Sequence, residues 1–259
     1  MGNLDSLIAL DMWGCNISGS ISTSIGNLTN LIYLKLSNNC LVGNIPSSIG
    51  NLIQLAFVDL YGNTSADSIP FGFANMTKWT AVSIGFNQLI GPIPFGHAHL
   101  RQLAILSLDN NQLTGPIPFG HANLTQLTIL TLVNNQLTGP IPFGLAKLTK
   151  LIILSLVYNR LTSTIAFGLM KITKLEILAL LGNEFQGHFP IPIINLKNLN
   201  VLDVFDNYLS GTVSICNITS LLIFDVSNNY FGSSLPKCLQ NMVQESKLRM
   251  ISLYDVRGH

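Results

Sequence analysis

The sequence predicts a solenoid of the α/β repeat class, in which about ten similar coils stack into one elongated body. Three observations support this prediction: an Asn recurs every 24 residues, a leucine pattern precedes each Asn, and a segment rich in Gly, Ile and Pro often follows it. Each observation predicts one part of the coil.

The recurring Asn identifies a column of buried side chains. Successive members lie 24 residues apart, except that the last interval is shortened to 22. An Asn amide both donates and accepts hydrogen bonds, so it can satisfy backbone groups where each coil turns inside a dry interior. We call this column the asparagine ladder, and it comprises Cys15, Asn39, Asn63, Asn87, Asn111, Asn135, Asn159, Asn183, Asn207 and Asn229.

The pattern Leu-x-x-Leu-x-Leu before each ladder residue predicts a short strand. Side chains alternate along a strand, so Leu127, Leu130 and Leu132 should point inward while Ile129 and Thr131 point outward. Strands of neighbouring coils would then stack about 4.8 Å apart into a parallel sheet with an uncovered outer face.

The pattern Leu-x-Gly-x-Ile-Pro follows the ladder residue, for example at 41–46, 113–118 and 137–142. Gly allows a backbone conformation that a Cβ atom would hinder, and Pro presets φ at the start of the return path. We expect an irregular or 3-10 return segment here. Asp67 and Ser163 replace the Gly, so we expect local loosening in those coils.

These motifs resemble the plant-specific class of leucine-rich repeats, which occurs in the ectodomains of receptor-like kinases and receptor-like proteins and in polygalacturonase-inhibiting proteins. The resemblance covers nearly the whole chain. It implies a right-handed solenoid with a concave parallel β-sheet. It also implies extracellular or cell-surface recognition of a protein or peptide ligand, with a leucine-rich repeat co-receptor as a further partner, in defence or developmental signalling.

Two alternatives to a receptor ectodomain stay open. One is a secreted inhibitor of pathogen enzymes that degrade cell walls, as the resemblance to polygalacturonase-inhibiting proteins implies. The other is a truncated, non-functional fragment. We expect the solenoid over residues 1–239 and an incomplete terminal repeat or tail over 240–259, because the chain opens inside a coil and ends before a further Asn.

Composition and motifs exclude several function classes. Thirteen basic and twelve acidic residues leave a net charge of +1, which gives no electrostatic basis for binding nucleic acid or an anionic membrane. No apolar stretch is long enough to insert across a membrane, and no signal peptide opens the chain. Phosphate-binding, zinc-protease, nucleophile-elbow and kinase motifs do not occur, so we expect no enzyme and no cofactor.

The outward strand positions are the predicted binding site. Exposed aromatic side chains together with acidic ones are typical of protein and peptide interfaces. The alternative is that these positions only stabilise the strands, above all where the third position holds Val or Ile. The predicted ligand-binding residues are Trp13, Tyr33, Phe57, Tyr61, Phe86, Asp109, Val133, Tyr158, Leu181 and Phe205.

Asn-x-Ser/Thr sequons suggest glycosylation in a secretory pathway. Four of them share one position, four residues before the next strand pattern, which places them on the solvent-facing return side. Asn63 is also a sequon but belongs to the asparagine ladder, so we expect it to stay unmodified. The four predicted glycosylation sites are Asn27, Asn75, Asn123 and Asn217.

The Cys and His residues give less specific predictions. Cys15 should be a reduced, buried thiol, and Cys40 should be unpaired. Cys216 and Cys238 fall in the return segments of adjacent coils, so a disulfide between them is geometrically possible. A group formed by His97, His99 and His121 could bind a metal, but no carboxylate or thiol has suitable spacing, and we predict no metal site.

Overall fold

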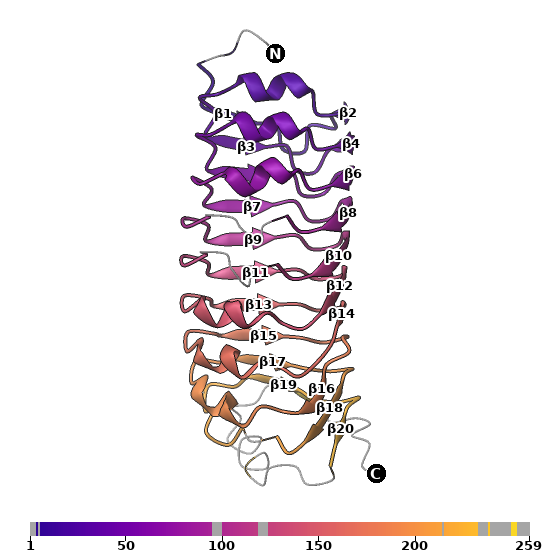
Figure 1. Cartoon of the computed structure of the whole chain (residues 1–259), viewed down its shortest axis with the longest axis vertical. Coiled ribbons are helices and arrows are strands. Elements are labelled where there is room, and N and C mark those ends of the chain that lie inside the picture. Colours follow the sequence, from indigo (N-terminus) through magenta and orange to yellow (C-terminus); the bar gives the residue numbers. More distant parts are fainter. Residues whose placement is uncertain are drawn as a thin grey trace.

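The computed structural model describes residues 4, 6–94, 100–118, 124–213, 215–232, 238 and 250–252. These residues form an elongated stack of coils, with the first coil at one end and the last at the other (Figure 1). Each coil contributes one strand to a long parallel sheet and then returns on the other side of the molecule. The predicted repeat solenoid is confirmed.

The long sheet has eleven strands, each hydrogen-bonded to the strand of the next coil. Its register pairs equivalent positions, as where Ile129 lies beside Ile153, because the interval between these coils is constant. The strands are β1 (Ala9–Asp11), β3 (Tyr33–Lys35), β5 (Phe57–Asp59), β7 (Ala81–Ser83), β9 (Ile105–Ser107), β11 (Ile129–Thr131), β13 (Ile153–Ser155), β15 (Ile177–Ala179), β17 (Val201–Asp203), β19 (Ile223–Asp225) and β21 (Met250–Ser252).

The core lies behind the long sheet and runs continuously through the coils. Leu127, Leu130 and Leu132 are fully buried, as the leucine pattern predicts. Trp79 takes the place of the first Leu in its coil, and it packs edge-on against Phe73 with ring centroids 4.8 Å apart. Burial of each such side chain contributes about 1.5–3 kcal/mol relative to exposure.

A second sheet lies where the sequence predicts irregular return segments. The Leu-x-Gly-x-Ile pattern places alternate side chains inward, because Leu113 and Ile117 are buried while Thr114 is exposed. That alternation is the period of a strand. The seven strands of this sheet are β2 (Ser18–Gly19), β4 (Cys40–Asn44), β6 (Thr64–Ser68), β8 (Gln88–Pro92), β10 (Gln112–Pro116), β12 (Gln136–Gly139) and β14 (Arg160–Leu161).

The second sheet ends at β14, and a separate three-stranded sheet follows. That sheet contains β16 (Gln186–His188), β18 (Tyr208–Gly211) and β20 (Tyr230–Phe231). Ser163 lies just after β14 and has a φ of 71°. This is close to the φ of Gly115 (77°) and Gly139 (76°), which occupy the same repeat position. Asp67 has a φ of 73° but stays paired within β6. Backbone hydrogen bonds still join the coils around Ser163, from the Glu184 amide to Leu161 O at 2.8 Å and from the Gln186 amide to Ser163 O at 3.0 Å, so no loosening is seen at Ser163 or at Asp67.

Short 3-10 turns complete many of the coils, as predicted. In most of them a Pro precedes the first residue and fixes an extended backbone there. No helix among the described residues is long and apolar enough to span a lipid bilayer. The turns are η1 (Thr23–Asn27), η2 (Ser47–Asn51), η3 (Phe71–Asn75), η4 (Phe143–Lys147), η5 (Phe167–Lys171) and η6 (Ile191–Asn195).

The asparagine ladder joins each coil to the preceding one by hydrogen bonds. Asn135 Oδ1 accepts from the Leu113 amide at 3.0 Å, and its Nδ2 donates to the carbonyls of Leu108 at 3.1 Å and Leu132 at 3.3 Å. The same pattern begins at Asn39, which accepts from Ile17, and continues to Asn229, which accepts from Leu209. The predicted role of the ladder Asn residues is thereby confirmed.

Cys15 departs from its prediction. Its thiol is free but exposed, so the expectation of a buried side chain is wrong. The reason is its place at the end of the stack, where no described coil covers it. Its Sγ donates only to the nearby Trp13 carbonyl, at 3.5 Å.

Candidate binding surface on the long sheet

The outward face of the long sheet carries columns of similar side chains. Because the register pairs equivalent positions, the third position of the leucine pattern forms a continuous aliphatic column beyond the first coils. These side chains are half-buried or exposed, so they form part of the outer surface. The column comprises Ile105, Ile129, Ile153, Ile177, Val201 and Ile223.

Aromatic side chains gather at the N-terminal end of this face. Tyr33 and Phe57 stack in parallel with ring centroids 4.5 Å apart, directly opposite each other on β3 and β5. Tyr61 and Phe86 lie next in line, with centroids 4.9 Å apart. These four predicted ligand-binding residues therefore form two contacting pairs.

Trp13 extends this aromatic surface by one coil. Lys35 places its Nζ 5.6 Å from the centre of the Trp13 ring, which is a cation-π contact. The Trp13 ring nevertheless remains more than half exposed. A ligand can therefore reach the ring, with a basic group already held beside it.

The remaining predicted residues lie farther along the sheet and form no aromatic pair with another described residue. Tyr158 is exposed, and its ring packs on Gly182 so closely that a Cβ atom there would lie 2.5 Å from the ring. Val133, Leu181 and Phe205 are half-buried. They continue the apolar surface beside the aliphatic column.

Asp109, which the sequence predicts as a ligand-binding residue, also stabilises the fold. Its carboxylate accepts hydrogen bonds from Ser107 Oγ at 2.9 Å, Thr131 Oγ1 at 2.7 Å and the Val133 amide at 2.7 Å. Two of these donors belong to the next coil. Asp109 therefore holds adjacent coils together on the outer face.

Other Asp residues on this face stabilise the turn that leaves the strand. Each accepts a hydrogen bond from the amide two residues ahead, as Asp59 does from Tyr61 at 3.1 Å and Asp203 from Phe205 at 3.1 Å. This is a local side-chain-to-backbone bond typical of Asp. These Asp side chains therefore stabilise the turns and also contribute negative charge to the outer face.

Asp203 and Asp225 lie directly opposite each other on β17 and β19. Burial raises the pKa of the Asp203 carboxyl above its usual value, and the nearby Asp225 carboxylate raises it further, while the hydrogen bond from Phe205 opposes both effects. Like charges opposite each other on neighbouring strands are unfavourable. A positive group on a ligand would relieve this repulsion.

Three of the four predicted glycosylation sites lie on the described return side. Asn27 and Asn75 end η1 and η3, and Asn217 follows Cys216; all three are exposed. Asn123 lies outside the described residues. Asn63 is buried, and its Nδ2 donates to the carbonyls of Leu36 and Leu60 inside the ladder.

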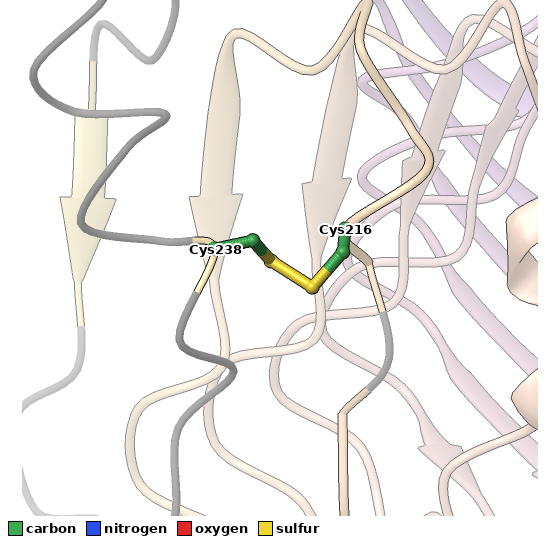
Figure 2. Close-up of a disulfide and its surroundings, with 2 residues drawn as sticks. All are labelled: Cys216 and Cys238. Atoms are coloured by element: carbon green, nitrogen blue, oxygen red, sulfur yellow. A yellow bond between two sulfur atoms is a disulfide. The ribbon is translucent and has the colours of Figure 1, made fainter.

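Cys216 and Cys238 form a disulfide, with an S–S distance of 2.01 Å and their Cα atoms 5.5 Å apart. Figure 2 shows this bond linking two segments of the last coils. Cys40 is free and exposed, and its Sγ donates to Asn16 Oδ1 at 3.4 Å.

Among the residues that the structure describes, no three His, Cys, Asp or Glu side chains gather as they would around a metal ion. His97, His99 and His121, which could have formed a metal-binding group, lie outside the described residues.

Comparison with known proteins agrees with this architecture. The Leucine Rich Repeat family model matches residues 6–28, 30–52, 102–124, 126–148 and 220–242. No curated protein matches the sequence.

Several solved structures resemble the chain over nearly its full length. A TDR receptor has a TM-score of 0.86 at 29% identity, covering 94% of this chain and 42% of the receptor chain. The ectodomain of the Arabidopsis receptor kinase HAESA, in complex with an N-terminally extended IDA peptide hormone, has a TM-score of 0.83 at 33% identity, covering 94% and 41%. A plant ice-binding protein has a TM-score of 0.73 at 29% identity, covering 97% and 83%.

The chain therefore spans about two fifths of the length of the two receptor ectodomains. The family model, the repeat geometry and these structures agree on one class. The chain is a leucine-rich repeat protein of the plant type, and it resembles the ectodomains of plant receptor kinases.

Proposed function

We propose that this chain is the recognition region of a plant receptor-like protein or receptor-like kinase, and that it binds an extended peptide or a protein along the long sheet. The observation that carries this proposal is the apolar outer face, on which aromatic pairs and an aliphatic column cross successive coils. The binding is passive and non-catalytic. A rigid face presents many side chains at once, so little ordering cost opposes binding.

The similarity to the HAESA ectodomain, which was crystallised with a peptide hormone, supports a peptide as the ligand. In this proposal the recognition takes place outside the cell, in defence or developmental signalling. A leucine-rich repeat co-receptor is the expected second protein partner. A rigid surface that only binds cannot transmit a signal by itself, so a second protein must recognise the ligand-bound form.

The charges on the long sheet favour a ligand that carries basic side chains. Asp11, Asp59 and Asp203 end strands on this face and are exposed or half-buried. Lys35 also lies there, but it already contacts Trp13. Complementary charge mainly increases the association rate and the specificity of a complex. We therefore expect binding to weaken as the salt concentration rises.

The test is selection of peptides from a displayed library of plant secreted peptides, followed by calorimetry with the selected peptide. A variant with Tyr61→Ser, Phe86→Ser, Tyr158→Ser and Phe205→Ser should lose at least about a hundredfold in affinity, because hot-spot aromatics contribute about 2 kcal/mol or more each. Circular dichroism should remain that of the unsubstituted protein.

The matched control is Phe143→Ser with Phe167→Ser. These two aromatic side chains are 73% and 65% exposed, but they begin the return turns η4 and η5 instead of lying on the long sheet. Affinity should be unchanged in the control. Equal losses in both variants, or undiminished affinity in the first, would contradict the proposal.

Extracellular location is tested separately by mass spectrometry of the protein expressed in plant cells through the secretory pathway. We expect glycans at Asn27, Asn75 and Asn217, which are exposed, and none at Asn63, which is buried. A glycan at Asn63 would show that the ladder does not form before glycosylation. Complete absence of glycans would argue against secretion.

A second candidate function is adsorption to ice. The outward side chains of β8, β10 and β12 include no charged residue, and these strands pair in parallel with the same two-residue offset, as where Thr114 lies beside Gln136. A regular, uncharged sheet face suits an uncharged crystal surface, and a plant ice-binding protein shares this fold. Measurable thermal hysteresis that Thr114→Lys and Thr138→Lys abolish would support this function, whereas absence of hysteresis would exclude it.

A further inference from the structure

Two tyrosines form an unusual feature at the C-terminal end of the solenoid, just after the turns that leave β17 and β19 of the long sheet. Tyr208 and Tyr230 each directly follow a ladder Asn and begin β18 and β20. Their rings lie nearly parallel, with centroids 6.1 Å apart and planes 19° apart. At the same repeat position three central coils carry Gln88, Gln112 and Gln136, and the two coils just before Tyr208 carry Arg160 and Glu184.

The two rings form walls of a cavity of about 200 Å³. The rest of its lining is polar and comes from the turns that leave the strands. Asp206 and Asn228 have φ values of 54° and 51°, and Asn228 Nδ2 donates a hydrogen bond to Asp206 Oδ1. Among the residues that the structure describes, the lining is Asn183, Asp206, Asn207, Tyr208, Asn228, Asn229 and Tyr230.

This lining combines flat aromatic faces with amide and carboxylate groups. A sugar ring has the matching chemistry, because its C–H face packs on an aromatic ring while its hydroxyls bond to amides and carboxylates at the edge. The cavity is smaller than the roughly 300–1,000 Å³ of pockets for drug-sized ligands, so it suits a single ring. The Asp206 carboxylate would repel an acidic sugar, and the described lining contains no Lys or Arg to attract one.

We propose that this cavity is a binding site for one ring of a neutral oligosaccharide. Tyr208, which is 52% exposed, provides the stacking face, and Asp206 accepts a hydroxyl hydrogen bond. The site adjoins the C-terminal end of the long sheet, because Asp206 and Asn228 lie in the turns that follow β17 and β19. A chain that recognises a peptide on its outer face would therefore bind a sugar beside that face, at a place two coils from Tyr158.

The experiment is saturation-transfer NMR followed by calorimetry, with cellohexaose, xylohexaose and chitohexaose as neutral probes and a galacturonate hexamer as the anionic probe. At least one neutral probe should bind, with a Kd of about 1 mM or tighter. Tyr208→Ala should weaken that binding by about tenfold or more, which corresponds to the loss of one stacking contact. Asp206→Asn, which tolerates the positive φ, should weaken it by a smaller factor.

Two control variants separate this site from other effects. Gln136→Ala changes the same repeat position three coils earlier and should leave sugar binding unchanged. Tyr158→Ser alters the long sheet and should likewise leave it unchanged, so that failure of the peptide proposal and failure of this one are distinguishable. Absence of binding by every neutral probe, preference for the galacturonate hexamer, or equal binding by the Tyr208→Ala protein would overturn the proposal.

Discussion

Replacement of a central ladder residue, Asn135→Ala, should destabilise the solenoid strongly. The Leu113 amide donates to Asn135 Oδ1 at 3.0 Å, and in the variant this buried donor loses its acceptor. An orphaned buried donor costs about 1–3 kcal/mol. The carbonyls are affected less, because Leu132 O also accepts from Asn159 at 2.9 Å and Leu108 O also accepts from Asn111 at 3.1 Å.

Each carbonyl therefore keeps one donor and loses the net stabilisation of one hydrogen bond, about 0.5–1.5 kcal/mol. Nδ2 also contacts Val133 O at 3.2 Å, which keeps the Asn110 amide as a donor. The orphaned amide and the bonds of the two Nδ2 hydrogens together give a loss of about 4 kcal/mol in the free energy of unfolding. Cys15→Ala is the matched control, because Cys15 occupies the same repeat position but is exposed. It should cost less than about 0.5 kcal/mol, as surface substitutions usually do.

Urea unfolding followed by far-ultraviolet circular dichroism and by tryptophan fluorescence provides the assay. Trp79 is buried, so its emission shifts when its coil unfolds, whereas Trp13 is already exposed and changes less. Circular dichroism reports on the whole sheet. Because each coil contacts only its neighbours, a central defect can also split the transition. The reasoning would be refuted if Asn135→Ala and Cys15→Ala shifted the urea midpoint equally with a single unchanged slope.

Two further substitutions test other parts of the molecule. Cys216→Ser with Cys238→Ser should lower the free energy of unfolding by about 3 kcal/mol, since the bond closes a loop with a separation of 22 residues; an unchanged thermal midpoint would contradict this. Asp203→Asn should be more stable than the unsubstituted protein at pH 7, because burial and Asp225 raise the folded-state pKa of Asp203 and so make its ionisation costly. As the pH falls through the folded-state pKa, the unsubstituted protein regains this stability, and the difference should vanish below about pH 4, where the unfolded chain is also protonated. Equal urea midpoints at pH 7 would show that the hydrogen bond from Phe205 outweighs burial.

The long sheet, the ladder and the leucine core could be predicted because each repeats one physical requirement at a fixed interval. Leu130 in one coil and Leu154 in the next must meet the same core, so the pattern shows in the sequence alone. The second sheet was missed for a specific reason. The Gly in Leu-x-Gly-x-Ile indicates a turn, although the flanking residues, such as Leu113 and Ile117, alternate as in a strand.

The binding surface was predictable only as a set of outward positions. The sequence places Tyr33 and Phe57 at equivalent positions of adjacent coils, and the structure brings their rings together as that register requires. The hydrogen bonds of Asp109 could not be predicted, because its donor Thr131 lies 22 residues away and depends on side-chain rotation. The tyrosine cavity was missed because the sequence shows the equivalent positions of Tyr208 and Tyr230 but not that their rings lie nearly parallel beside Asp206 and Asn228.

The outer face separates two kinds of side chain that a binding experiment must keep distinct. Tyr61, Phe86 and Tyr158 hydrogen-bond to neighbouring coils through their backbones, whereas their side chains make no hydrogen bond to another described coil. Their replacement therefore changes the surface at little cost to the fold. Asp109, by contrast, faces outward while it accepts bonds from the next coil. Replacement of Asp109 therefore changes stability and surface charge together, and a loss of affinity in such a variant would not identify a ligand contact. Because the aromatic residues lack this coupling, variation at their positions can change ligand preference while the coils stay stacked, and so one scaffold can serve different ligands.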